Sequence, residues 1–329
     1  FFFLMIRRPP RSTLFPYTTL FRSLLSKNVA SKLIVAGVLA LDDLKTPHGS
    51  GKGVVGGAGI YSSVASSLFT ETALVAAIGY DFPVDFINKI ESKGIDIKSV
   101  RKLEYPTFHW SGEYKGDMAQ AITHETDFQI NDHYDWEIEK EHRMVRSLLL
   151  CNNDPNIQKR VLEQMDAEII AMDTMNLWID IAKETLNNVV SQVDILFIND
   201  AEAQLYSNSE NLDEASQKLL GKGPRYIIIK KGEHGASLYT EDSVSHLPAF
   251  AVKKFVDPTG AGDSFAGATM GYLTNVKALD KDSLIVAMNY GAAVASITVE
   301  GFGTTRIMDL SKPEVEERFQ KLSGGPGRI

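Results

Sequence analysis

The chain has a single cysteine, Cys151, among its 329 residues, so a disulfide framework is excluded. No apolar run reaches the roughly 18 residues that a membrane-spanning helix needs. Basic residues are in the minority, with 34 Lys and Arg against 42 Asp and Glu and a formal charge of −8, which argues against a nucleic-acid partner. The seven histidines show no metal-ligand spacing. These absences favour a cytoplasmic protein that binds neither membranes nor nucleic acid.

The first 23 residues differ from the rest of the chain. The run Met5–Ser23 resembles the conceptual translation of a short-read sequencing adapter, and we interpret residues 1–23 as an assembly artefact. A targeting peptide is the alternative, since the segment has four arginines and no acid. However, an apolar block ahead of the charges and the pair Pro9-Pro10 fit neither a secretory nor a transit pattern. Residues 24–329 are then expected to form the functional domain.

Short apolar runs that indicate buried strands alternate with helical patterns. The alternation predicts an α/β fold with a mostly parallel sheet that helices cover on both faces. Two closely spaced runs, 236–239 and 246–250, predict an antiparallel edge. The predicted parallel strands are 33–36, 73–78, 148–151, 169–172, 195–198 and 226–229. The predicted helices are 57–69, 83–93, 155–165, 177–190, 200–206, 211–221, 262–274 and 280–298.

Two segments, 41–55 and 99–130, do not fit this alternation. The first is polar and rich in glycine, and the second alternates aromatic and small residues with few helix signals. Both are predicted to form strands outside the main sheet. Since ligands of open α/β sheets bind beyond the carboxyl ends of the strands, where these segments begin, they are expected to form a small β lid. Such a lid also offers a surface for a homodimer.

The most informative stretch is Asp257–Phe265, a turn of small residues ahead of an apolar helix. The backbone N–H groups of Gly260, Ala261 and Gly262 have almost no side chains around them, and a helix start adds about half a positive charge. Asp263 lies in the same turn and could accept a proton from a hydroxyl held beside a bound anion. A glycine-rich helix cap with an ordinary aspartate is the alternative for Gly-x-Gly-Asp alone. The whole stretch indicates phosphoryl transfer.

Asp257-Pro258-Thr259-Gly260-Ala261-Gly262-Asp263-Ser264-Phe265 closely resembles the C-terminal signature of the ribokinase-like (PfkB) carbohydrate kinase family. The resemblance implies a three-layer α/β/α sandwich with a small β lid. It also implies transfer of the γ-phosphoryl group of ATP, with Mg²⁺, to a hydroxyl of a sugar or sugar-like small molecule. Asp263 would be the general base, and the Gly260–Gly262 amides would form the anion hole. Many family members bind K⁺ beside this hole, through a loop that matches Asp257 and Thr259 here.

Other segments resemble the nucleotide-binding elements of the family. Asn199-Asp200-Ala201-Glu202 resembles the element that holds Mg²⁺ through water, with Glu202 as its acid, but on local grounds it fits a helix capping box equally well. Asp173–Asn176 closes a strand on the expected ligand side. The nucleotide-binding residues that the resemblance implies are Asn199, Glu202, Lys230, Gly232, Gly235, Thr259, Gly260, Gly262 and Asn289.

The acceptor side matches the family less closely. Gly56-Gly57 precedes a helix and would let a substrate approach the backbone. The family usually has an asparagine that contacts sugar hydroxyls where this chain has Tyr61, and a second polar contact is replaced by Ala40. The tyrosine weakens the case for a plain pentose or hexose. The implied acceptor-binding residues are Asp42, Gly56, Gly57, Tyr61, Asn153 and Asp263.

Three alternative functions remain to be weighed. Gly51–Gly56 matches the dinucleotide fingerprint Gly-x-Gly-x-x-Gly, but it does not directly follow a strand, which argues against a Rossmann dehydrogenase. A nucleoside kinase of the same fold could stack a base on Tyr61, Phe108 and Trp110, although these rings could equally pack within the lid. A non-catalytic sugar-binding regulatory protein is disfavoured, because it has no need of the base Asp263.

Overall fold

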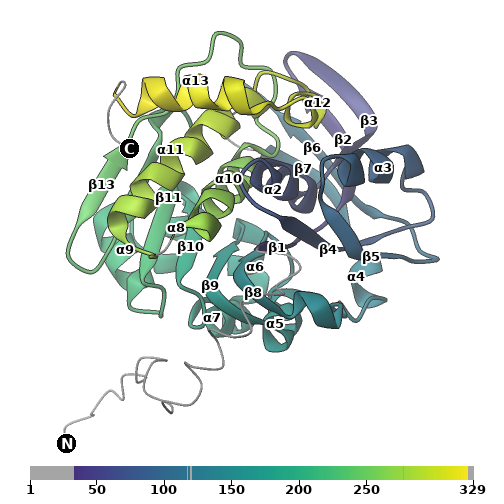
Figure 1. Cartoon of the computed structure of the whole chain (residues 1–329), viewed down its shortest axis with the longest axis horizontal. Helices are drawn as coiled ribbons and strands as arrows, with labels where there is room; N and C mark the ends of the chain where they lie inside the picture. Colours follow the sequence, from purple (N-terminus) through teal and green to yellow (C-terminus); the bar gives the residue numbers. More distant parts are fainter. Residues whose placement is uncertain (1–32, 117, 119–120, 277, 325–329) are drawn as a thin grey trace, which may run out of the picture. The chain divides into compact units, whose positions relative to one another are not determined.

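The computed structural model (Figure 1) describes residues 33–116, 118, 121–276 and 278–324. These described residues form one compact unit. The segment 1–23, interpreted above as an assembly artefact, lies outside the described residues. In the part of the chain that is described, no helix is long and apolar enough to cross a membrane.

The central sheet has nine strands in the order β13-β12-β11-β10-β9-β8-β1-β4-β5. The strands from β11 to β5 are parallel, and β12 and β13 add an antiparallel edge. Both features confirm the sequence prediction. All residues of β1 and β4 are buried, as expected for strands covered on both faces. The bounds are β1 Leu33–Ala36, β4 Thr72–Ile78, β5 Asp96–Lys102, β8 Met144–Leu150, β9 Asp166–Asp173, β10 Ile195–Asn199, β11 Tyr226–Lys230, β12 Ala236–Tyr239 and β13 Val244–Leu247.

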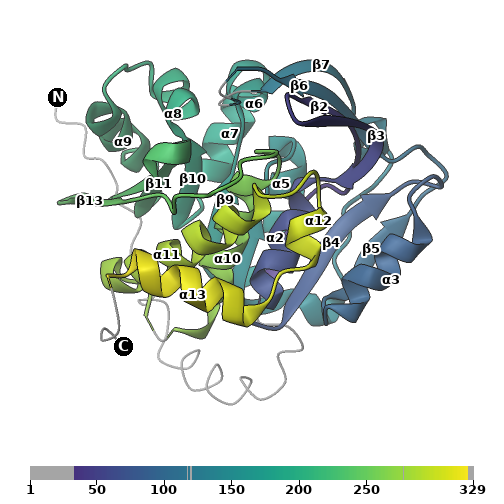
Figure 2. The same ribbon diagram turned by 90° about the horizontal axis from the view of Figure 1, so that it is seen from above.

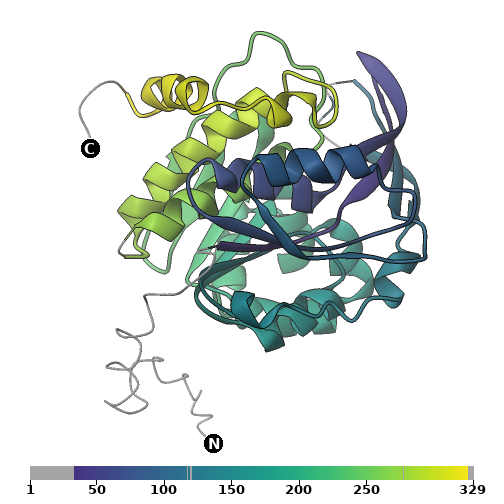
Figure 3. The same cartoon turned by 45° about the vertical axis from the view of Figure 1, so that its right-hand side comes forward.

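Helices cover both faces of this sheet (Figure 3), which confirms the predicted three layers. On one face α10 packs against α2 and α11. A methyl group at Gly267 or Gly271 of α10 would overlap the backbone of α2, so glycine lets these two helices approach closely. The bounds are α2 Ala58–Ser67, α3 Val84–Ser92, α4 Gln129–Asp132, α5 Pro155–Gln164, α6 Asn176–Ile181, α7 Lys183–Val190, α8 Asp200–Ser207, α9 Leu212–Leu220, α10 Ala261–Asn275, α11 Lys281–Thr298, α12 Thr305–Met308 and α13 Lys312–Leu322.

Four helical segments differ from the sequence prediction, and two of them, α4 and α12, are single turns that were not predicted. The single helix expected over 177–190 is divided into α6 and α7 at Ala182, whose φ of −132° is not helical. Helix α13 was not predicted. Its buried residues are Val315 and Phe319, so the apolar pattern that reveals a helix is weak there.

A second sheet of four strands forms the lid, in the order β3-β2-β6-β7. Figure 2 shows these strands together as a group apart from β4 and β5. The predicted lid segment 41–55 falls within this sheet. The predicted segment 99–130 begins too early, because residues 99–102 belong to β5, which pairs with β4 in the central sheet. The lid strands are β2 Ala40–Thr46, β3 Gly49–Gly56, β6 Phe108–Tyr114 and β7 Ala121–Asp127.

Candidate active site

The turn ahead of α10 has the geometry of an anion-binding helix start. Gly260 is the N-cap residue, with a φ of 75° that favours glycine. The N–H of Ala261 donates to the carbonyl of Pro258 (3.1 Å), so this predicted anion-hole donor is already used. Within the described residues, the amides of Gly260 and Gly262 donate no backbone hydrogen bond. They remain as donors for a ligand.

Asp263 lies in the first turn of α10 and is half-buried. The hydroxyl of Ser62 in α2 donates to the backbone carbonyl of Asp263 (3.0 Å), which ties this turn to α2. Burial raises the pKa of the Asp263 carboxyl to about 6; the charge of Asp173 acts in the same direction and that of Lys230 opposes it. The carboxyl is therefore mostly ionised at neutral pH, as a general base must be.

Lys230, the last residue of β11, lies directly beside the turn. A methyl group at Gly262 would lie 3.1 Å from Lys230 Nζ. The ammonium group pairs with Asp173 Oδ2 at the end of β9 (2.5 Å), and both side chains are largely buried. Burial alone would lower the pKa of Lys230, but the carboxylates of Asp173, Glu202 and Asp263 raise it. A protonated lysine thus stands next to the free amides.

Asn199 and Glu202 form a capping box at the start of α8. The Asn199 side chain accepts from the Glu202 N–H (2.7 Å), and the Glu202 carboxyl accepts from the Asn199 N–H (3.0 Å). The pKa of Glu202 is raised to about 7, mainly by burial; the charge of Lys230 opposes the rise and that of Asp173 adds to it. Glu202 therefore caps helix α8, and its carboxyl is also one of the charged groups around Lys230.

Asp42 of β2 is buried on the acceptor side, at 4% exposure. A methyl group at Gly56 would overlap the Asp42 carboxyl, so the glycine makes room for it. Burial, together with the charges of Asp257 and Asp263, raises the pKa of Asp42 to about 8. Asp42, Asp257 and Asp263 are therefore near one another, and we call them the acidic cluster. Gly57, with a φ of 100°, lies against the Val38 carbonyl at the start of α2.

Tyr61 in α2 is buried beneath the turn, at 1% exposure. A methyl group at Gly260 would overlap the Tyr61 ring, so the ring packs directly against the N-cap of α10. The hydroxyl has no hydrogen-bond partner within the described residues. Because its ring is covered, Tyr61 cannot stack on a base, as the nucleoside-kinase alternative had suggested.

One face of lid strand β6 carries aromatic side chains toward the acidic cluster. Alternation places Phe108, Trp110 and Tyr114 on that face, and Trp110 is the register partner of Asp42 in β2. The Trp110 indole donates to the hydroxyl of Thr123 (3.1 Å). Burial raises the pKa of Tyr114, and the charges of the acidic cluster contribute to the rise. Two of the three predicted stacking residues therefore remain on this face.

Asp257 holds the loop before α10 in place. Its Oδ1 accepts from the Thr259 N–H (2.9 Å) and its Oδ2 from the Gly303 N–H (2.8 Å). The side chain thus connects the signature turn to the loop that follows α11. The hydroxyl of Thr259 is buried beside the phenol of Tyr114, and hydrogen bonding between them opposes the rise that burial causes in the pKa of Tyr114.

The remaining predicted residues have structural contacts of their own. Asn153 accepts from Asn131 Nδ2 (3.2 Å), and Asn289 donates to the Ile285 carbonyl one turn earlier in α11 (3.0 Å). Gly232 and Gly235 both have positive φ in the turn between β11 and β12. A side chain at Gly235 would also overlap the backbone around the end of β13. These contacts explain the residue types without a ligand.

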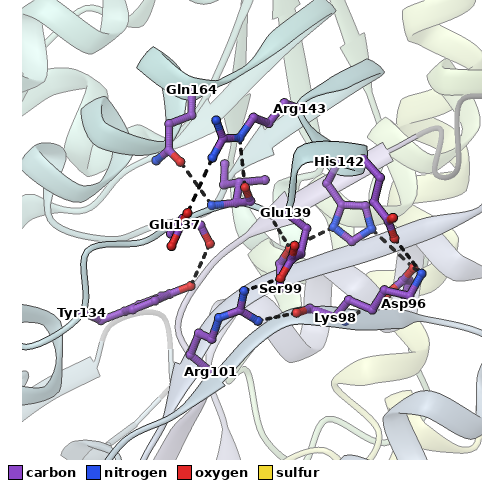
Figure 4. Close-up of polar contacts among 12 residues, drawn as sticks. Asp96, Lys98, Ser99, Arg101, Tyr134, Glu137, Glu139, His142, Arg143 and Gln164 are labelled. Atoms are coloured by element: carbon purple, nitrogen blue, oxygen red, sulfur yellow. Dashed lines mark hydrogen bonds and ion pairs between the residues drawn. The ribbon is translucent and has the colours of Figure 1, made fainter.

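A separate polar cluster lies along β5 (Figure 4). Ligand atoms of Asp96, Glu141 and His142 lie within 4.8 Å of one another, a spacing that could hold a metal ion. However, Lys98 Nζ lies 2.6 Å from Glu141 and 3.6 Å from Asp96. The lysine ammonium group already supplies the positive charge, so the cluster is explained as a structural link between β5 and the residues before β8.

Comparison with known proteins agrees with the fold. The profile of the pfkB family carbohydrate kinases matches residues 36–310. The cytidine kinase of Thermococcus kodakarensis is 28% identical over 247 residues, which cover 73% of this chain and 88% of that protein.

Two solved structures share the fold. The nucleoside kinase of Burkholderia thailandensis in complex with inosine superposes with a TM-score of 0.71 at 17% identity, covering 89% of this chain and 97% of that one. A protein described as a ribokinase II from E. coli, in complex with ATP and Mg²⁺, superposes with a TM-score of 0.68 at 20% identity, covering 88% and 99%.

Proposed function

The chain belongs to the pfkB family of carbohydrate kinases, phosphotransferases that act on an alcohol group, and we propose that it is an ATP- and Mg²⁺-dependent nucleoside kinase. The observation that carries the proposal is the aromatic face of β6, where Trp110 stands beside the buried acid Asp42. A nucleoside offers a base for the aromatic face and ribose hydroxyls for the acid. The similarity to a cytidine kinase supports this acceptor over the more general sugar or sugar-like molecule that the sequence resemblance implies.

In the proposed reaction Asp263 takes the proton of the attacking hydroxyl as the γ-phosphoryl group moves. Its pKa of about 6 keeps it ionised at neutral pH yet basic enough to accept a proton. The amides of Gly260 and Gly262 stabilise negative charge on the transferring group, and Lys230 beside them binds the phosphates. The carboxyl of Glu202 suits a hard cation, and Mg²⁺ held by it through water would offset phosphate charge.

The acceptor would lie between the lid and the acidic cluster. Asp42 would bind a ribose hydroxyl, and the base would stack on Trp110. The test is a phosphorylation screen of nucleosides and free sugars, followed by Trp110→Ala. This variant is expected to raise the KM for the nucleoside by roughly 5- to 150-fold, since base–aromatic stacking contributes about 1–3 kcal/mol. The KM for ATP should stay unchanged.

A matched control lies one residue away in the same strand. His109 points to the other face of the lid, toward Asp43 (3.6 Å), so His109→Ala should change neither KM. Equal effects of the two variants, or a free sugar phosphorylated more efficiently than every nucleoside, would contradict the nucleoside assignment.

We further propose that a monovalent cation binds beside the anion hole, near Asp257 and the buried hydroxyl of Thr259. Such a cation would act by fixing the loop that Asp257 connects to Gly303. Rates in K⁺ are expected to exceed those in a large organic cation at equal ionic strength. Equal rates would leave Asp257 with its capping role alone.

A homodimer through the lid is the proposed assembly. Strand β7 is at one edge of the lid sheet, and Ile122 on it is 44% exposed. Light scattering should give twice the chain mass, and Ile122→Lys should reduce it to the mass of one chain. An unchanged mass would place the interface elsewhere.

A further inference from the structure

Lid strand β6 is joined to the central sheet by the segment 103–107, which we call the lid root. It runs beside the turn 79–82 that follows β4, and the N–H of Tyr80 in this turn donates to the carbonyl of Tyr105 (3.1 Å). A methyl group at Gly79 would overlap the backbone of the lid root. The glycine therefore lets the turn and the lid root approach closely.

Asp81, in the same turn, holds the last residue of the lid root. Its Oδ1 accepts from both the N–H (2.8 Å) and the hydroxyl (2.6 Å) of Thr107. The same hydroxyl accepts from the Gly79 N–H (3.0 Å), so its donor and one of its acceptor positions are both used. Thr107 is 3% exposed, which limits the access of water to these bonds. We call Asp81, Thr107 and Gly79 the root clasp.

The root clasp lies next to the aromatic face of the lid. Strand β6 begins directly after Thr107, and Trp110 lies three residues further along the chain. Because successive residues of a strand alternate in direction, a fixed Thr107 also fixes the direction of Trp110. Pairing with β2 sets the register of β6 within the lid, whereas the root clasp sets the position of β6 relative to the end of β4.

The chain leaves the lid beside the place where it enters. The ring of Tyr105 in the lid root stacks on His133, with 3.7 Å between the ring centroids and 4° between the ring planes. His133 follows α4, the helix after the last lid strand β7. Short connections without secondary structure otherwise vary in position. The stack joins the two connections of the β6–β7 pair, and the root clasp holds them at the end of β4.

We propose that Asp81 is a positioning residue for the acceptor: by holding Thr107 at the start of β6, it sets where Trp110 lies relative to the phosphate side of the site. Asp81 itself is exposed and needs no contact with the substrate. The proposal rests on the nucleoside kinase function proposed above, since it takes Trp110 as the ring on which the base stacks. It predicts an effect on acceptor binding that is separate from any effect on stability.

Variants at both ends of the clasp should have the same effect. Asp81→Ala, and Thr107→Val, which lacks the hydroxyl, should each raise the KM for the nucleoside about fivefold or more, because a displaced Trp110 loses part of its stacking. The KM for ATP should stay unchanged. Thr107→Ser keeps the hydroxyl and should have the wild-type KM. Asp85→Ala is the matched control, since this exposed aspartate lies one turn later, at the start of α3, and should change neither KM.

The decisive measurement is a double-mutant cycle with Trp110→Ala, at a temperature well below melting. If Asp81 acts through Trp110, Asp81→Ala should raise the nucleoside KM about fivefold or more in the wild-type chain and less than about twofold in the Trp110→Ala chain. An equal rise in both chains would overturn the proposal. So would a lower melting temperature with an unchanged nucleoside KM, which is the result that a merely stabilising clasp predicts. If Asp81→Ala does not fold, Thr107→Val takes its place in the cycle with the same two outcomes.

Failure of the nucleoside assignment gives a different result. It is shown by the wild-type screen alone, when a free sugar is phosphorylated and no nucleoside is. The clasp variants are then measured with that sugar. A raised KM for the sugar with an unchanged KM for ATP would support the positioning role of Asp81, and equal constants in wild type and Asp81→Ala would overturn it.

Discussion

Replacing Asp42 by asparagine is expected to stabilise the unliganded protein while weakening acceptor binding. Asp42 is 4% exposed, and burial with the nearby charges of Asp257 and Asp263 raises its pKa from 3.8 to about 8. The native protein therefore holds a proton on this group that the unfolded chain releases above pH 3.8. Residues kept for binding at the expense of stability are common in active sites.

The direction of the pH dependence follows from this proton. Below the unfolded pKa of 3.8 both states are protonated and burial of Asp42 costs nothing in ionisation. As pH rises toward about 8 the unfolded state gains the ionised form first, so stability is lost at up to about 1.4 kcal/mol per pH unit. At pH 7 the loss is about 4 kcal/mol. An asparagine at this position does not titrate, so the variant escapes this loss.

The assay is denaturant unfolding of wild type and Asp42→Asn from pH 4 to pH 8.5. Other groups titrate in both proteins, so they largely cancel in the difference between the two unfolding free energies. That difference should grow in favour of the variant by about 4 kcal/mol between pH 4 and pH 7 and level off above pH 8. If the difference between the two unfolding free energies stays constant with pH, whether it is positive or negative, Asp42 is not buried in its protonated form.

Three further predictions concern the phosphate side. Asp263→Asn should lower kcat by a factor of about 10²–10⁴ while retaining ATP binding. The rise of kcat that wild type shows as pH increases through about 6 should be absent in this variant. Near-normal turnover would remove Asp263 from the mechanism. Glu202→Gln should raise the Mg²⁺ concentration for half-maximal rate, and an unchanged Mg²⁺ dependence would leave Glu202 with its capping role only. Lys230→Met should raise the KM for ATP about tenfold or more, the effect of losing one charge-assisted contact; an unchanged KM would place the phosphates away from β11.

Sequence patterns predicted the fully buried strands of the central sheet better than its exposed edge strand. Strands such as β1 and β4 are entirely buried, so their apolar runs are unmistakable. Strand β5 lies at the sheet edge and reads Asp-Ile-Lys-Ser-Val-Arg-Lys, with Ser99 its buried residue. Such a polar segment carries no signal for a central sheet, which is why residues 99–102 were assigned to the lid.

In the candidate site, the sequence predicted contacts between residues close in the chain, but it did not predict contacts between distant ones. The anion-hole turn is contiguous in sequence, so its motif identified it together with Asp263. The pairing of Lys230 with Asp173, by contrast, joins the ends of two different strands. The packing of Tyr61 on Gly260 joins two different helices. No periodicity or spacing reports such contacts, and the burial of Tyr61 was missed for that reason.

The charge balance of the site constrains how it can be used. Burial raises the pKa of four carboxyl groups in the site, those of Asp42, Asp173, Glu202 and Asp263. On the phosphate side, Lys230 is the cationic side chain that lies near Asp173, Glu202 and Asp263 within the described residues. Phosphates brought to this place would meet more negative than positive charge, so the nucleotide is expected to bind with a divalent cation rather than alone. On the acceptor side, a neutral polyol can satisfy buried hydroxyl and carboxyl groups without adding charge. The two halves of the site therefore select for different chemistry, and the free amides of Gly260 and Gly262 lie where they meet.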